Sequence, residues 1–191
     1  MVSKQAKDAK VWKELTIDLE LPQGVSAKYE DNNLIVTGPK GELSKNMKFP
    51  NITVEVKDGK VLISTKRFSQ SEKKIMFTYK AHTKNLIKGV TQGFEYKLVV
   101  VYAKFPITVL SNGNVFTVKN LLGEKVPRTT KIPSDVKVEI KAKDIIVTGI
   151  DKERVGQMAA SIEQLTRITH LDRRIIQDGI FITQKPHSKV V

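Results

Sequence analysis

Apolar and polar residues alternate along most of this chain, and twice the alternation gives way to apolar residues spaced three or four apart. The clearest example is the stretch 132–167. Residues 136–141 alternate between apolar and charged side chains, and residues 145–148 are all β-branched, which predicts two short strands. Asp151 is a candidate N-cap, because apolar residues from Val155 onward recur at helical spacing.

The first half of the chain shows the same order of elements. We expect a strand at 14–21, a hairpin within 25–37 and a second hairpin within 52–63. The segment 38–43, Gly-Pro-Lys-Gly-Glu-Leu, is expected to be a rigid turn that opens a basic segment. A helix fits residues 71–87, and four residues fall on its predicted apolar face: Ile75, Tyr79, His82 and Leu86.

The second half repeats this pattern with a strand at 95–102, a hairpin within 107–118 and a basic loop at 128–131 before the stretch 132–167. The two halves overlay with an offset that grows from 81 residues (Glu14 on Glu95) to 84 residues (Val54 on Val138). This duplication predicts an α+β fold of two tandem domains, in which one helix covers each antiparallel sheet.

We place the boundary between the two domains in the polar break bracketed by Gly89 and Gly93. The final residues have no counterpart in the first copy and are expected to form a basic tail. The predicted organisation is an N-terminal arm, a first repeat, a second repeat and a C-terminal tail, at 1–11, 12–90, 91–171 and 172–191 respectively.

Charge narrows the class of partner. The 191 residues include 33 Lys and Arg against 20 Asp and Glu, so the net charge of +13 favours a polyanionic partner, nucleic acid first. No run of apolar residues is long enough to span a membrane, and no secretory signal precedes the first strand. We therefore expect a cytosolic protein without a membrane partner or a small-molecule substrate.

Enzyme chemistry finds little support. Without Cys and with three scattered His, neither a metal site nor any other cofactor is expected. His82 lies on the predicted apolar helix face and is expected to pack there. The turn at 38–41 lacks the spacing of a phosphate-binding P-loop. An enzyme acting on RNA through His82 or Asp178 is kept as a third hypothesis.

The basic residues of the second half are the candidate RNA contacts, because loops and termini can follow a phosphate backbone and arginine binds two phosphate oxygens at once. Lysines on the helix at 71–87 suit RNA contact and simple solvation equally well. Aromatic residues make up only 6%, which favours recognition of folded RNA by shape over base stacking. The predicted RNA-binding residues are Lys125, Arg128, Lys131, Lys152, Arg154, Arg167, Arg173, Arg174 and Lys185.

Two segments resemble the universal large-subunit ribosomal protein six family, called large-subunit protein nine in eukaryotes. They are 36–43 (VTGPKGEL) and 164–185 (QLTRITHLDRRIIQDGIFITQK), the second resembling the tail of the eukaryotic and archaeal branch. The sequence departs from that tail at Leu171, Ile176 and Phe181, where a basic residue, Phe and Tyr are usual.

This resemblance implies two similar α+β domains and binding of large-subunit ribosomal RNA through the second domain and tail. It further implies neighbouring ribosomal proteins, a position beside the sarcin–ricin loop and stalk base where translation factors dock, and residence in cytoplasmic ribosomes, with nucleolar assembly in a eukaryote. A non-ribosomal RNA-binding adaptor built on duplicated domains remains the alternative.

Overall fold

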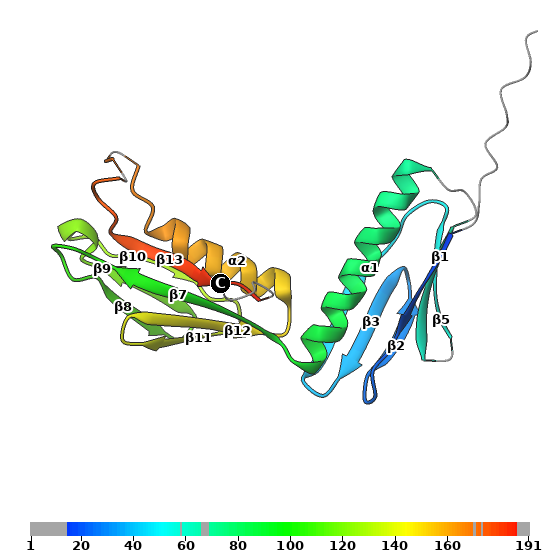
Figure 1. Ribbon diagram of the computed structural model, residues 1–191. Coiled ribbons are helices and arrows are strands. Elements are labelled where there is room, and N and C mark those ends of the chain that lie inside the picture. The colour runs from blue at the N-terminus through cyan, green and yellow to red at the C-terminus, as the bar shows by residue number, and fades with distance from the viewer. Residues whose placement is uncertain (1–14, 58, 66–68, 170, 173, 187–191) are drawn as a thin grey trace, which may run out of the picture. The chain divides into compact units, whose positions relative to one another are not determined.

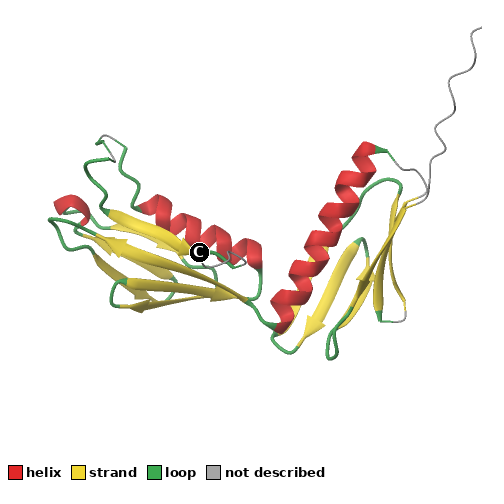
Figure 2. Cartoon of the chain, viewed as in Figure 1, coloured by secondary structure: helices red, strands yellow, loops and turns green. Residues whose placement is uncertain are grey.

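The computed structural model describes residues 15–57, 59–65, 69–169, 171–172 and 174–186 (Figure 1). The predicted N-terminal arm, the turn residue Asp58 and the candidate RNA contact Arg173 lie outside these residues. The chain forms two compact units, Met1–Ile87 and Lys88–Val191. Both units combine antiparallel sheets with one α-helix, which confirms the predicted fold class of two α+β repeats (Figure 2).

The first unit divides its strands between two sheets, where we expected one. One sheet has the order β1-β6-β5 and the other the order β2-β3-β4. Because Gly41–Asn46 alternates in burial and pairs with β3, the segment predicted as a turn at 38–43 turns only at Gly38–Gly41 and continues as a strand. The elements are β1 (Leu15–Glu20), β2 (Ser26–Glu30), β3 (Asn33–Gly38), β4 (Gly41–Asn46), β5 (Ile52–Lys57), β6 (Lys60–Thr65) and α1 (Gln70–Thr91).

Helix α1 is longer than predicted, and its buried face differs from the face predicted from the sequence. It continues to Thr91 because Lys88 O accepts from the amides of both Gln92 and Gly93, and Gly93 ends it in the left-handed region at φ 77°. The predicted break at 88–93 is therefore mainly the last turn of the helix. Ile75 and His82 are only half-buried. The face buried against the sheets comprises Met76, Tyr79, Thr83, Leu86 and Val90.

The second unit repeats the arrangement with a three-stranded sheet, β10-β9-β8, and a four-stranded sheet, β11-β12-β7-β13. Asp151 caps α2 as predicted, its side chain accepting from the amide of Glu153 at 2.9 Å. The elements are β7 (Phe94–Val101), β8 (Thr108–Asn112), β9 (Val115–Lys119), the short 3₁₀ helix η1 (Leu121–Gly123), β10 (Arg128–Lys131), β11 (Val136–Lys141), β12 (Asp144–Gly149), α2 (Lys152–Leu165) and β13 (Gly179–Gln184).

The duplication is visible in strand order and burial. The order β1-β6-β5 recurs as β7-β12-β11. Leu34 and Val36 are fully buried on β3, and Phe116 and Val118 hold the same positions on β9, an offset of 82 residues (116 − 34). The same pair of inward-facing positions thus builds the core under the sheet β2-β3-β4 and under its counterpart β8-β9-β10.

Strand β13 corrects the expectation of a separate tail from residue 172. Residues 179–184 pair antiparallel with β7 and extend the larger sheet of the second unit, and Ile180 is fully buried. Among the described residues, the first unit has no equivalent of this strand on the outer edge of β1. The repeat could not predict β13, because the first copy supplies no template for it.

Candidate nucleic-acid interface

Three loops of the second unit are tied together beside the C-terminal end of α2. They are 102–107 between β7 and β8, 120–127 between β9 and β10, and 166–178 between α2 and β13; we call them the loop end (Figure 1). The buried carboxylate of Asp178 accepts from the amide of Ala103 at 2.9 Å, which joins the first loop to the third. Asn120 Nδ2 donates to Pro106 O at 3.0 Å, which joins the first loop to the second. These bonds fix the three loops as one surface.

Arg128 was predicted to lie in a loop, and this is wrong. It begins β10, and its alternating neighbours pair with β9. Its guanidinium donates to both oxygens of Glu124, at 2.9 and 2.6 Å, and to the backbone carbonyls of Leu165 and Arg167, at 2.9 and 3.2 Å. Arg128 therefore holds the loop end together, and RNA contact by this residue stays a prediction.

Lys125 and Arg167 are differently placed. Both side chains are exposed at the loop end, and neither has an ion-pair partner among the described residues. The backbone around Arg167 is fixed, because Arg128 bonds its carbonyl and Thr166 Oγ1 accepts from the amide of Ile180 at 2.9 Å. Their charges are thus presented to solvent from a rigid base.

Arg174 belongs to the same surface but is paired. Its Nη2 donates to Asp172 Oδ2 at 2.8 Å, and its backbone amide donates to Asp172 Oδ1 at 2.9 Å. These two bonds, the side-chain bond first, lower the pKa of the Asp172 carboxyl, so the carboxylate stays ionised at neutral pH. A phosphate at Arg174 has to compete with this carboxylate.

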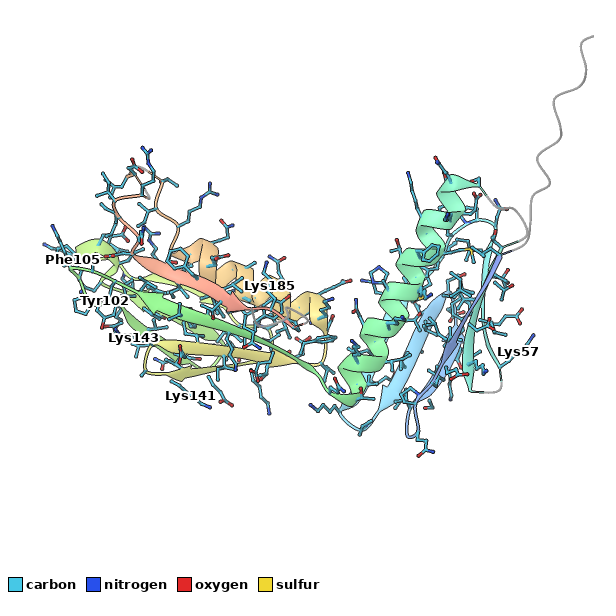
Figure 3. All side chains as sticks on the ribbon, viewed as in Figure 1. Lys57, Tyr102, Phe105, Lys141, Lys143 and Lys185 are labelled. Carbon is cyan, nitrogen blue, oxygen red and sulfur yellow. The ribbon has the colours of Figure 1, made fainter. Side chains whose placement is uncertain are left out.

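The remaining predicted contacts do not share this surface. Hydrogen bonds link Ile180 to Thr166 and Ile182 to Glu163, so β13 and α2 run in opposite directions. Lys185 is five residues beyond Ile180 and therefore lies about 15 Å from the loop end, in the direction of the N-terminal end of α2. Figure 3 shows it well apart from Phe105 of the loop end. Lys152 lies at that N-terminal end, and Lys131 ends β10.

The N-terminal end of α2 is a less favourable phosphate site than its basic residues predicted. Arg154 Nη1 lies 2.9 Å from Asp135 Oδ2, and its Nε lies 3.9 Å from Asp151 Oδ2. The Asp151 side chain also takes the amide of Glu153. Two carboxylates at a helix N-terminus oppose an incoming phosphate and use donors that would bind it.

The loop end is concave and carries a basic–aromatic pair that we had not predicted. A groove of about 700 Å³ lies between the C-terminal end of α2 and the start of β13, lined on one side by Arg167 and Ile168 and on the other by Gln177 and Asp178. In the first loop, Lys104 is exposed and Phe105 is 45% exposed. The signal that could have found this pair is Lys-Phe in a loop at the end of a strand.

Two other kinds of feature are absent from the described part of the chain. No group of three or more Asp, Glu or His there could hold a metal ion. No helix there is long and apolar enough to cross a membrane.

Comparison with known proteins identifies the family to which this chain belongs. The family model described as Ribosomal protein L6 matches residues 21–93 and 105–179, one match to each repeat. The protein called large ribosomal subunit protein uL6 from Methanosarcina mazei is 43% identical over 173 residues, covering 91% of this chain and 98% of that protein. Proteins of the same name from Methanothrix thermoacetophila and Methanobrevibacter smithii are 42% and 40% identical, covering 87% and 88% of this chain and 95% and 94% of theirs. The resemblance read from two short segments is thereby confirmed, and the chain belongs to the ribosomal protein L6 family.

Proposed function

We propose that this protein is a structural constituent of the large ribosomal subunit and that it binds large-subunit ribosomal RNA through the loop end of its second unit. The relatives that match along nearly their whole length are named as large-subunit proteins. The family is not enzymatic, which agrees with our prediction that the protein has no catalytic role. Asp178, which the sequence left as a candidate catalytic acid, accepts instead from a backbone amide.

The observation that carries this proposal is the rigid display of unneutralised charge at the loop end. Lys104, Lys125 and Arg167 project from loops that hydrogen bonds hold to one another. Contacts to phosphates fix the register of a protein on folded RNA, and preformed contacts spend little conformational entropy on binding. Such a surface suits a protein that holds RNA segments in a fixed arrangement.

The direct test is binding of purified protein to large-subunit ribosomal RNA over a range of salt concentrations. The double variant Lys125→Ala/Arg167→Ala should bind more weakly, and its plot of log K against log salt should flatten by about 0.7–0.9 for each phosphate that the variant no longer neutralises. The matched control is Lys28→Ala/Lys48→Ala, which removes the same charge from two exposed positions of the first unit that are not candidate RNA contacts. Equal effects of both double variants would show that net charge alone governs binding.

Assembly is tested separately from RNA binding. A large-subunit constituent should sediment with large subunits at physiological salt. A non-ribosomal RNA-binding adaptor would bind RNA in the first test yet remain in the light fractions of the second.

The position on the subunit is the finest part of the proposal and rests on family resemblance. We expect the loop end to lie near the sarcin–ricin loop and stalk base, where translation factors dock. A photo-crosslinking group at Lys125 of subunit-bound protein should label that RNA, and labelling of another RNA region would refute this position while leaving the binding proposal intact.

A further inference from the structure

Phe105 is a large aromatic side chain presented to solvent in the first loop of the basic loop end. Its side chain (Figure 3) is 45% exposed, it follows the exposed Lys104, and its ring lies close to Gly123, two residues before Lys125. Tyr102 lies at the start of the same loop. The loop end thus presents an apolar ring next to exposed lysines of two different loops.

The backbone on each side of Phe105 is held in place. Asp178 Oδ1 accepts from Ala103 N at 2.9 Å, and Pro106 O accepts from Asn120 Nδ2 at 3.0 Å. The ring itself lies against Gly123, where an added Cβ would be 3.6 Å from Phe105 Cε1. The ring is therefore preorganised, and an incoming group would lose little free energy in fixing it.

The exposed ring is not covered by a cation, unlike two other aromatic rings of the chain. Lys143 Nζ lies 4.9 Å from the centre of the Tyr102 ring, and Lys80 Nζ lies 5.7 Å from that of Phe77. No cation takes this position over Phe105 among the described residues. Lys104 and Lys125 are both exposed and are available to bind phosphates next to whatever group covers the ring.

The geometry points to an unpaired nucleobase as that group: we propose that a base from a loop or bulge of the bound RNA stacks on Phe105 while Lys104 and Lys125 hold adjacent phosphates. This inference rests on the proposed RNA-binding function. A flat aromatic face flanked by cations matches the alternation of base and phosphate in a nucleotide chain. Bases within a duplex are already stacked on both faces, so the occupant has to be unpaired. Base stacking is thus added to the shape recognition expected from the low aromatic content.

Two hairpin RNAs test the class of ligand. They share one stem sequence and one compact tetraloop, whose bases are the same in both. One stem carries a single bulged 2-aminopurine, and the other stem is fully paired. The wild-type protein should bind the bulged hairpin more tightly and quench the fluorescence of its 2-aminopurine. Tighter binding to the paired hairpin, or binding of the bulged one without quenching, would overturn the inference.

Variants of Phe105 test the residue. Phe105→Leu keeps an apolar side chain but has no flat ring, and it should weaken binding of the bulged hairpin about tenfold while leaving the paired hairpin unchanged. Phe105→Trp should restore tight binding. Phe77→Leu, which removes an exposed aromatic from α1, is the matched control. Both leucine variants should have the same midpoint of urea unfolding as the wild-type protein, because both rings are substantially exposed.

The outcomes separate this inference from the function it rests on. Equal affinity of wild-type and Phe105→Leu protein for the bulged hairpin overturns base stacking, even where Lys125→Ala/Arg167→Ala still weakens binding to ribosomal RNA. Unchanged RNA affinity combined with poorer incorporation into large subunits would identify the occupant as a protein neighbour and likewise overturn it. Failure of the wild-type protein to bind ribosomal RNA at all would instead refute the proposed function.

Discussion

The guanidinium of Arg128 donates a hydrogen bond to the backbone carbonyl of Leu165 at 2.9 Å, across 37 residues of sequence. Leu165 is the last residue of α2, and its carbonyl is one of the four that a helix leaves without an internal partner at its C-terminus. The cation also lies at the negative end of the helix dipole. Arg128 therefore fixes α2 to β10, and a basic residue expected to bind RNA has a structural role.

Arg128→Met should lower the free energy of unfolding by about 1.5–3 kcal/mol, because it removes bonds from a charged donor to Glu124 and to two carbonyls. Methionine keeps the apolar stem, so packing is little changed. Urea unfolding measures the effect, and Lys131→Met, at an exposed position on the same strand, should stay within about 0.5 kcal/mol of wild type. Wild-type stability of Arg128→Met with weakened RNA binding would instead return Arg128 to the interface.

Asp172→Asn should strengthen RNA binding. The Asp172 carboxylate is ionised at neutral pH and occupies the guanidinium of Arg174, and this bond lowers the pKa of the carboxyl further. Asparagine keeps an oxygen that can accept from the Arg174 amide, which preserves the turn, but it loses the charge. The freed arginine should steepen the salt dependence of RNA affinity by about 0.7–0.9, the slope expected for one additional phosphate.

The control for Asp172→Asn removes a carboxylate from the first unit. Glu20→Gln breaks an exposed pair with Lys60, in which the Lys60 ammonium lowers the pKa of Glu20. It should leave the salt dependence unchanged. Equal gains in affinity from both variants would mean that net charge, and not the release of Arg174, is responsible.

The order of elements was predictable because each copy has to rebuild the same core. Leu34 and Phe116 occupy matching buried positions on β3 and β9, and the alternation around each is written in the sequence. The phase of α1 was less predictable. Its sequence offers two adjacent apolar residues, Ile75 and Met76, and only packing against the sheets decides that Met76 is buried.

The candidate site was predictable in composition but not in arrangement. In the short strand β10, the half-buried Arg128 and Thr130 alternate with the exposed Thr129 and Lys131. Because all four side chains are basic or hydroxyl-bearing, the sequence predicted a loop there. Whether an arginine is free or paired depends on carboxylates that approach from elsewhere, as Asp135 does for Arg154. Local sequence offers Glu124 as a partner for Arg128, but it does not show the carbonyls of Leu165 and Arg167 that the same guanidinium binds. The structure was needed to separate Arg128 and Arg154 from Lys125 and Arg167.

Gly149→Ala should destabilise the second unit by about 1–3 kcal/mol, because an added Cβ would lie 2.6 Å from Val155 Cγ2 and 3.1 Å from the backbone oxygen of Asp135. Val155 begins the buried face of α2, so the clash would push the helix from the sheet. Val155→Ala removes the first clash but not the second. In a double-mutant cycle by urea unfolding, the two substitutions should therefore cost less together than the sum of each alone, and strict additivity would show that they do not meet.

Tyr29 on β2 and Tyr79 on α1 should make the first unit sensitive to alkaline pH. Burial raises the pKa of both phenols above 10.0, and for Tyr79 the neighbouring Tyr29 raises it further. In the unfolded chain both ionise near pH 10, before they do so in the folded protein, so the unfolded state releases protons first. The contribution of the two phenols to the free energy of unfolding is therefore fully present below pH 10. It falls as the pH rises toward the folded-state pKa values, by at most about 1.4 kcal/mol per pH unit for each tyrosine. In the double variant Tyr29→Phe/Tyr79→Phe, the free energy of unfolding should fall less steeply between pH 10 and pH 11. The lysines also titrate in this range, but they are the same in both proteins, so their effect cancels in the comparison. Urea unfolding between pH 8 and pH 11 measures the difference, and parallel pH profiles of variant and wild type would show that neither phenol is shielded from water by the packing of α1.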